Sequence, residues 1–256
     1  MPGLTANAHS FDGLIAAGLA ERMRVLALDL RGRGLSDKPD GGYRMSDHAA
    51  DVLGLMDALD LDRVVLGGHS FGGLLTYHIA ASHPDRVESC VVIDAPAEVD
   101  ETILDQIKPS LDRLDMVLPS RDAYLEMVKA MPYFDGWWDP AIDGYVRADV
   151  REQDDGTVRA RSRPEHIRAA VEGTLEIDWP EVVASIERPL LFLRAPDPFG
   201  PPGSPPLVAE AKAHATMALL RDGRLVEIPG NHMTCLFGSS AVKAVEAIEA
   251  FVLEDR

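Results

Sequence analysis

The pentapeptide at residues 68–72 (GHSFG) separates an apolar run from an apolar helical pattern. The run at 63–67 (RVVLG) has the length of a buried parallel strand, and residues 72–82 have the spacing of a helix. A G-x-S-x-G pattern in this context is typical of a sharp strand-to-helix turn, because small residues let the chain bend at the serine. The serine hydroxyl then lies at a helix N-terminus, where backbone N–H groups and the helix dipole stabilise negative charge. We therefore predict that Ser70 is a nucleophile.

Short apolar runs elsewhere in the chain indicate a sheet. Further strands are predicted at 24–30, 89–94, 189–194 and 224–229. Further helices are predicted at 46–59, where Ser46 is the expected N-cap, and at 241–253. Because strands alternate with helices, we expect an α/β fold with a mostly parallel sheet and helices on both faces.

The segment at 97–187 interrupts this alternation with a series of helical patterns. Helices are expected at 101–118, 121–130, 164–176 and 180–186, with a polar turn at 153–157. We interpret this segment as a helical lid, or cap, inserted into a core that is formed by residues 1–96 and 188–256. The segment at 195–206 is expected to be irregular, because its prolines and glycines exclude regular structure.

A serine hydroxyl is a weak nucleophile unless a base removes its proton. His232 is the predicted base, since it directly follows the last predicted strand, in the sequence PGNH, and precedes the final helix. His69 is adjacent to Ser70 in the sequence, but we expect its side chain to point away at the turn.

These motifs together resemble α/β-hydrolases of the esterase and lactonase type. The sequence DLRGRGLSDKP at 29–39 is similar to a loop of that family, and SHPDRVESCVVIDAP at 82–96 resembles the link from its nucleophile helix to the next strand. The resemblance covers residues 3–96 and 188–253, and the order of Ser70 before His232 also agrees with it. It implies the α/β-hydrolase fold with a helical lid, and structural roles for Asp29, Arg31 and Asp37.

The resemblance also implies an acidic residue that orients the histidine, and two positions match it. Asp94 follows the predicted strand at 89–94, and Asp197 follows the one at 189–194. Backbone geometry favours Asp94, because Asp197 is restricted by Pro196 and Pro198 on either side. Both remain candidates, and the other carboxylate is expected to support a loop.

The family forms its oxyanion hole from two backbone N–H groups, which the resemblance assigns to Phe71 and Leu4. Pro2 stands where the family usually has a histidine, and the strand that normally leads into this loop is not found in the sequence, nor are the two before it. Three explanations are open. The sequence is a fragment or has a misplaced start, the strands at 24–30 and 63–67 pair directly, or a second chain supplies the missing edge.

The aromatic cluster in the lid is the candidate substrate pocket. Met131, Phe134, Trp137 and Trp138 are expected either to line an acyl pocket or to pack the lid onto the core.

The expected partner is a small-molecule ester or lactone. The formal net charge of −17 and the absence of a basic cluster argue against a nucleic-acid partner. No apolar run is long enough to span a membrane, and residues 1–13 do not have the layout of a secretory signal, so the expected location is cytoplasmic. No metal or organic cofactor is implied, and an unpaired sheet edge makes a homodimer possible.

The resulting hypothesis is a serine esterase that forms an acyl-enzyme on Ser70. A lactonase with the same catalytic residues is the first alternative. A non-catalytic, hydrolase-like binding protein is the alternative from a different class, because the expected oxyanion loop is incomplete.

Overall fold

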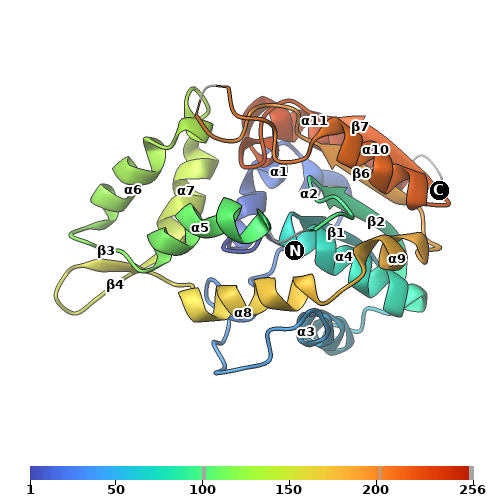
Figure 1. Ribbon diagram of the computed structural model, residues 1–256, viewed down its shortest axis with the longest axis horizontal. Helices are drawn as coiled ribbons and strands as arrows, with labels where there is room; N and C mark the ends of the chain where they lie inside the picture. Colours follow the sequence, from blue (N-terminus) through green and yellow to red (C-terminus); the bar gives the residue numbers. More distant parts are fainter. Residues whose placement is uncertain (100–101, 202, 254–256) are drawn as a thin grey trace.

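The computed structural model describes residues 1–99, 102–201 and 203–253. Within these residues the main feature is a parallel sheet with the strand order β1-β2-β6-β7 (Figure 1). The strands are β1 (Val64–His69), β2 (Val87–Ile93), β6 (Leu190–Arg194) and β7 (Gly223–Glu227). Their carboxyl ends are aligned, since His69 lies opposite Ile93 and Ile93 opposite Leu193. The loops that follow the strands therefore meet at one edge of the sheet.

Both faces of this sheet are buried, as the continuous apolar runs of its strands predict. Cys90 and Val92 pack into one hydrophobic cluster, and Val91 and Ile93 pack into another, because successive side chains of a strand point to opposite faces. The first cluster includes residues of α3 (Met45–Ala58), α4 (Phe71–Ser82) and α10 (Glu210–Leu219). The second includes residues of α1 (Asp12–Ala16) and α11 (Gly238–Leu253), and α2 (Leu19–Arg22) follows α1. The expected α/β architecture is therefore confirmed.

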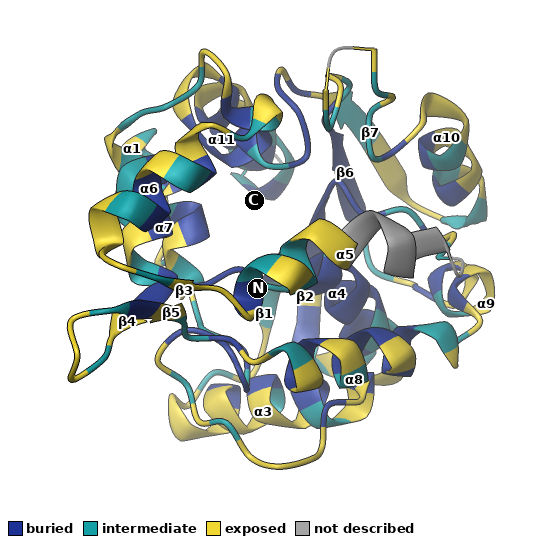
Figure 2. Cartoon of the chain, turned by 60° about the vertical axis from the view of Figure 1, so that its left-hand side comes forward, coloured by how far each residue is buried: buried dark blue, intermediate teal, exposed yellow. Residues whose placement is uncertain are grey.

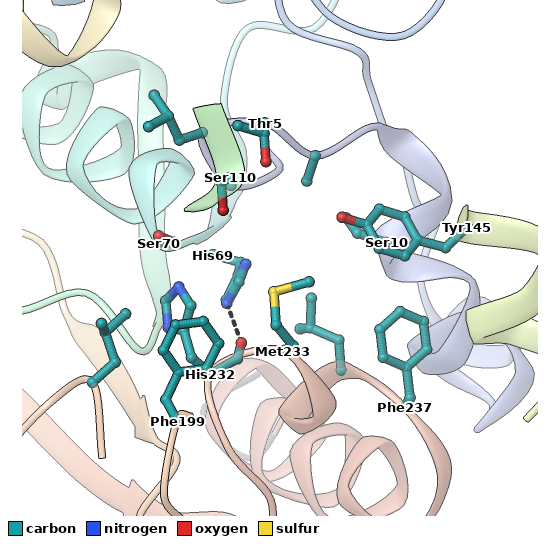
Figure 3. Close-up of a pocket in the computed structure, with 15 residues that line it drawn as sticks. Thr5, Ser10, His69, Ser70, Ser110, Tyr145, Phe199, His232, Met233 and Phe237 are labelled. Atoms are coloured by element: carbon teal, nitrogen blue, oxygen red, sulfur yellow. Dashed lines mark hydrogen bonds between the residues drawn. The ribbon is translucent and has the colours of Figure 1, made fainter. Parts of the chain in front are cut away.

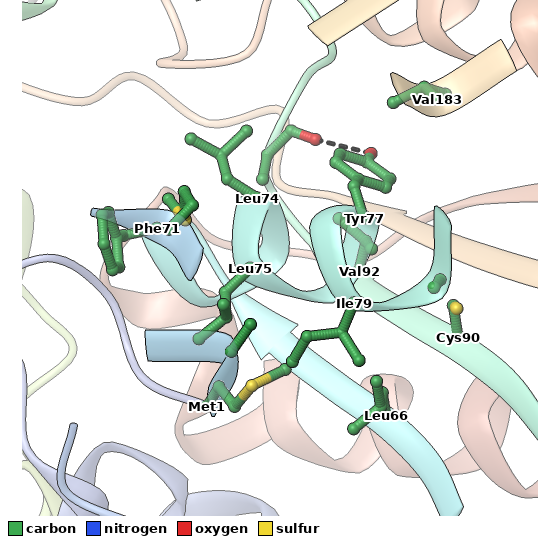
Figure 4. Close-up of a cluster of buried hydrophobic side chains, with 14 of the residues drawn as sticks. Met1, Leu66, Phe71, Leu74, Leu75, Tyr77, Ile79, Cys90, Val92 and Val183 are labelled. Atoms are coloured by element: carbon green, nitrogen blue, oxygen red, sulfur yellow. Dashed lines mark hydrogen bonds between the residues drawn. The ribbon is translucent and has the colours of Figure 1, made fainter. Parts of the chain in front are cut away.

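The side chains of α4 hold this helix on the sheet (Figure 4). Leu75, Tyr77 and Ile79 are completely buried against strand residues that include Cys90 and Val92. The hydroxyl of Tyr77 donates a hydrogen bond to the carbonyl of Ala95 at 2.8 Å. This contact ties the helix to the loop after β2, in which one of the two candidate acids lies.

Between β2 and β6 the chain forms an insert of helices and a small antiparallel sheet. The helices are α5 (Thr102–Leu114), α6 (Arg121–Lys129), α7 (Pro140–Ala148), α8 (Pro164–Leu175) and α9 (Trp179–Ala184). The strands are β3 (Val117–Leu118), β4 (Val150–Glu152) and β5 (Val158–Ala160). The predicted polar turn joins β4 to β5, where Gln153 N donates to Thr157 O at 2.8 Å. Figure 2 shows exposed residues on the outer sides of these helices and buried residues on the central strands.

Several predicted element boundaries differ from the structure. Helix α5 ends at Leu114, so the predicted helix at 101–118 is too long at this end, while its first residue, Glu101, lies outside the described residues. Helix α3 begins at Met45, and Ser46 is not its N-cap. The carboxylate of Asp47 instead accepts a hydrogen bond from the N–H of Arg44 at 2.9 Å, which stabilises an earlier start.

The prediction of a sheet strand at 24–30 was wrong. Residues 24–30 form no β-ladder in the described part of the chain. Residues 24–27 and the β1 residues Val65 and Gly67 line a common cavity of about 170 Å³. The edge of β1 contacts Met1 instead, whose amino group donates to Gly67 O at 2.7 Å and whose carbonyl accepts from His69 N at 3.0 Å. The segments at 24–30 and 63–67 therefore do not pair directly.

Candidate active site

Ser70 lies on a sharp turn between β1 and α4. Its backbone has φ of 54° and ψ of −120°, a conformation that costs a non-glycine residue about 1–3 kcal/mol. Hydrogen bonds hold it in place, since Ser70 N donates to Ile93 O at 2.9 Å and Ser70 O accepts from Gly73 N at 2.8 Å. A Cβ on Gly68 would lie 1.9 Å from Gly72 O, so the turn requires a glycine at that position. The pentapeptide thus forms the strand–turn–helix that its sequence predicts.

His232 lies in the loop after β7 and contacts Asp94 in the loop after β2. Its Nδ1 is 2.7 Å from Asp94 Oδ2, and both residues are buried, with exposed fractions of 7% and 1%. The other carboxylate oxygen of Asp94 accepts a hydrogen bond from Ala195 N at 3.0 Å. Because Nδ1 faces a carboxylate, the proton of the neutral ring is assigned to Nδ1, which leaves Nε2 as an acceptor.

Asp197 is bonded to the backbone of the loop that carries His232. Asp197 N donates to Gly230 O, and Gly230 N donates to Asp197 Oδ2, both at 3.0 Å. This pair of bonds supports the histidine loop two residues before His232. Of the two candidate acids, Asp94 is therefore the one in contact with the imidazole.

His69 faces His232, contrary to the expectation that it points away. Its Nε2 lies 2.8 Å from the carbonyl oxygen of His232, and the two rings are 4.5 Å apart (Figure 3). The backbone of β1 continues through His69 before the turn, so its side chain is directed by the strand and not by the bend at Ser70. Burial lowers the pKa of His69 well below 6.5, and His232 lowers it further. The neutral ring donates from Nε2 and holds the histidine loop against the turn.

Ser70 and His232 line the same cavity, which has a volume of about 100 Å³. Figure 3 shows Ser70, His69 and His232 on one side and the rings of Tyr145 and Phe237 on the other. The remaining lining is largely apolar. We call this cavity the inner chamber.

A larger cavity of about 490 Å³, the outer chamber, adjoins the inner one. The two share Ser110, Phe199 and Leu207 in their linings. The ring of Phe199 stacks on Tyr133 at 5.1 Å and meets the ring of His232 edge-on at 5.5 Å. Phe199 therefore lies at the boundary between the chambers, directly beside the imidazole.

The predicted pocket residues are divided between the outer chamber and the core of the insert. Met131 lines the outer chamber. Phe134 is buried, and its ring packs edge-on against Trp138 at 5.6 Å, while Trp137 packs against the same cluster. Among the described lining residues of the two chambers, Phe134, Trp137 and Trp138 are absent. Their rings mainly pack the insert.

Sequence analysis missed the aromatic residues that do face the chambers. They are Tyr145, Phe199 and Phe237, whereas Tyr133, which lines the outer chamber, belongs to the predicted aromatic cluster. Phe199 and Phe237 stand far from the predicted cluster along the chain. Phe199 lies in the irregular proline-rich segment, where no periodicity indicates which side chains turn inward.

Leu4 and Phe71 are the residues to which the resemblance assigns the oxyanion hole. Leu4 lines the inner chamber with Ser70, and Phe71 is the first residue of α4. A Cβ on Gly3 would lie 3.5 Å from Ser70 Cβ, so this loop packs directly on the serine. Within the described part of the chain, the backbone N–H groups of Leu4 and Phe71 donate to no protein acceptor.

Neither a metal-binding cluster nor a membrane-spanning helix is found among the residues that the structure describes. No group of three or more His, Cys, Asp or Glu side chains is arranged to hold a metal ion. No helix in the same residues combines the length and the apolarity that a membrane span requires.

Comparison with protein families gives a match between residues 1–119 and the family described as alpha/beta hydrolase fold. A curated relative from Mesorhizobium japonicum, 2-(acetamidomethylene)succinate hydrolase, is 31% identical over 232 residues, which is 89% of this chain and 78% of the relative. A 2-hydroxy-6-oxo-2,4-heptadienoate hydrolase from Pseudomonas putida is 35% identical over 134 residues, 52% of this chain and 45% of its own length. The second likeness spans less than half of that enzyme.

Solved structures are similar over almost the whole chain. The crystal structure of E-2-(acetamidomethylene)succinate hydrolase superimposes with a TM-score of 0.84 at 26% identity, covering 98% of this chain and 89% of that one. An enol-lactonase from Burkholderia xenovorans has a TM-score of 0.74 at 21% identity, with 98% and 88% covered. The second similarity concerns the fold alone.

Proposed function

Because this chain belongs to the α/β-hydrolase family, we propose that it is a serine hydrolase that cleaves carboxylic esters through an acyl-enzyme on Ser70. The observation that carries the proposal is the 2.7 Å contact between His232 and the buried carboxylate of Asp94, in a cavity that Ser70 also lines. A buried carboxylate on Nδ1 stabilises the imidazolium that forms when Nε2 takes a proton.

The proposed reaction has two halves. Ser70 Oγ attacks the carbonyl carbon of the ester while His232 Nε2 accepts its proton, and the same nitrogen then protonates the departing alcohol. The oxyanion accepts hydrogen bonds from the N–H groups of Leu4 and Phe71. Water, deprotonated by His232, hydrolyses the acyl-enzyme and releases the acid. Asp94 keeps its charge throughout.

The sizes of the two chambers support a short acyl group and a larger leaving group. An apolar cavity of about 150 Å³ accommodates benzene, so the inner chamber, at about 100 Å³, suits an acyl chain of a few carbons. The outer chamber, at about 490 Å³, has room for the alcohol part. The segment at 97–187 would then act as the lid that forms much of the outer chamber.

A second candidate substrate is the compound in the name of the curated relative, 2-(acetamidomethylene)succinate. The 31% identity over 89% of this chain favours it. Its carboxylates require cationic partners, however, and Arg113, the cation among the described lining residues, is paired with Asp149. We therefore rank the neutral ester first. A lactone would use the same residues.

The test is hydrolysis of p-nitrophenyl butyrate by the purified protein and by Ser70→Ala, with Ser82→Ala at the far end of the same helix as the matched control. We expect turnover by the protein and by Ser82→Ala, and loss of at least about 1,000-fold in Ser70→Ala. Turnover of 2-(acetamidomethylene)succinate or a γ-lactone at a higher kcat/KM would replace the ester as substrate. A folded protein that hydrolyses none of them, and is not labelled by a fluorophosphonate, would support the non-catalytic alternative.

A further inference from the structure

Arg33 is a completely buried arginine beside the proposed oxyanion site. Its exposed fraction is 0%. Its Nε donates to the carbonyl of Leu4 at 2.9 Å, and its Nη1 donates to the carbonyl of Arg31 at 2.8 Å. The guanidinium carbon also lies 5.2 Å from the centre of the Phe71 ring. One side chain therefore contacts both residues whose N–H groups are proposed to bind the oxyanion.

The charge of Arg33 has no carboxylate partner in the described part of the chain, and its Nη2 has no hydrogen-bond partner there. Asp29, on the same loop, is occupied by two backbone groups, since it accepts from Ala8 N at 2.7 Å and from Leu35 N at 2.8 Å. Burial lowers the pKa of Arg33 to about 9, so the group stays cationic at neutral pH. Burying a charge without a partner is strongly unfavourable.

The polar neighbour of Arg33 cannot offset this charge. His48 lies with its Nε2 3.4 Å from Arg33 Nη1, and burial together with the charge of Arg33 lowers the pKa of His48 to about 3. The imidazole is therefore neutral. A neutral amide side chain would donate an equivalent hydrogen bond to the Leu4 carbonyl. This bond therefore does not explain why the side chain at position 33 is charged.

We propose that Arg33 is a positioning residue that fixes the Leu4 backbone and supplies fixed positive charge behind the oxyanion site. The inference rests on the proposed function. Negative charge appears near Leu4 and Phe71 when the tetrahedral intermediate forms, and it then gives the buried cation the partner it lacks in the resting enzyme. An interaction gained only in the transition state raises kcat and leaves ground-state binding unchanged.

The test compares Arg33→Gln, which keeps a donor but removes the charge, with Arg33→Lys, which keeps the charge. The matched control is Arg31→Gln, because Arg31 is two residues away, is partly exposed and pairs with Asp51 at 2.5 Å. We expect kcat for p-nitrophenyl butyrate to fall about 100-fold in Arg33→Gln with KM changed by less than about threefold. Arg33→Lys should recover at least tenfold of this loss, and Arg31→Gln should match the parent protein. Equal rates in Arg33→Gln and Arg33→Lys, or a loss confined to KM, would overturn the inference.

Two further measurements cover the cases in which the Arg33→Gln variant does not fold or the protein hydrolyses no ester. If Arg33→Gln does not fold by circular dichroism, the pH profile of Arg33→Lys decides. Burial lowers the pKa of a lysine below its ordinary value of about 10.4, so the kcat of Arg33→Lys should fall with rising pH as this lysine loses its proton. The pKa of His48 is about 3, and those of Tyr43 and Arg31 are raised above their ordinary values, so none of these neighbours gives such a fall. A profile parallel to that of the parent protein would overturn the inference.

If the parent protein hydrolyses none of the esters, the proposed function fails separately. Titration with butylboronic acid then tests Arg33, because its serine adduct is a tetrahedral anion. The Kd should rise at least tenfold in Arg33→Gln, and an unchanged Kd, or no adduct in either protein, would overturn the inference.

Discussion

Asp94 Oδ2 lies 2.7 Å from His232 Nδ1, although 138 positions separate the two residues in the chain. The parallel sheet explains the contact. Asp94 follows β2 and His232 follows β7, and parallel strands bring their carboxyl ends to one edge. Asp197 reaches the same edge after β6, but its carboxylate bonds the backbone of Gly230. Asp94 thus contacts the imidazole, whereas Asp197 supports the backbone of the loop that carries it.

Replacing each acid with asparagine should separate these roles. Asp94→Asn removes the charge beside Nδ1, and we expect kcat for p-nitrophenyl butyrate to fall about 1,000- to 10,000-fold. Asp197→Asn keeps an oxygen that accepts from Gly230 N, so kcat should stay within about threefold of the parent value. A larger loss in Asp197→Asn than in Asp94→Asn would reverse the assignment.

The fold and the strand–turn–helix that carries Ser70 could be predicted because their signals are local. The apolar runs and the pentapeptide placed strands β1, β2, β6 and β7 within two residues of their observed ends, and family membership confirms the fold. The pairing of strands, by contrast, depends on segments that are distant along the chain. The segment at 24–30 has the composition of a strand, yet it joins no sheet in the described residues, because a ladder needs a neighbour at hydrogen-bonding distance.

The parts of the site that could not be predicted depend on contacts between distant segments. Arg33 stands in a loop that the sequence marked as structural, and only the folded chain shows that its guanidinium reaches Leu4. The direction of His69 and the inward turn of Phe199 likewise follow from where the loops after β7 and β6 pack. The choice between Asp94 and Asp197 remains a prediction, which the contact with His232 supports.

Phe199→Ala should change the preferred acyl chain. The substitution removes the ring that both chambers share and opens the inner chamber into the outer one. We expect the ratio of kcat/KM for p-nitrophenyl octanoate to that for the butyrate to rise about tenfold or more, since each buried methylene contributes about 0.8 kcal/mol. Phe251→Leu, on the partly buried side of α11, is the control and should leave the ratio unchanged. An unchanged ratio in Phe199→Ala would mean that the acyl chain does not lie against this ring.

Gly72→Ala should destabilise the protein and disturb the serine. A Cβ at this position would lie 2.1 Å from the carbonyl oxygen of Met1, and backbone atoms cannot yield as a flexible side chain does. We expect the free energy of unfolding to fall by about 2 kcal/mol or more, measured by urea denaturation. The control is Gly54→Ala in α3, where no atom lies within 4 Å of the added Cβ. It should stabilise the protein by about 0.5–1 kcal/mol, because alanine is the better helix former.

His48 should make the protein less stable in mild acid. Its pKa is about 3 in the folded chain, because of burial and the charge of Arg33, and about 6.5 when the chain is unfolded. The unfolded state therefore binds more protons between these values, so this contribution to stability is complete above pH 6.5 and is lost as the pH falls. Between pH 7 and pH 5 the loss from this group is about 2 kcal/mol.

His69 adds a loss of the same sign, since burial also lowers its pKa. His48→Gln should remove the loss of stability that His48 causes between pH 7 and pH 5, and should leave the loss that His69 causes. Urea denaturation of both proteins at pH 7 and pH 5 measures the difference. Equal losses in the two proteins would show that His48 already carries its proton in the folded chain at pH 5, and that the cation of Arg33 is not held against a neutral imidazole.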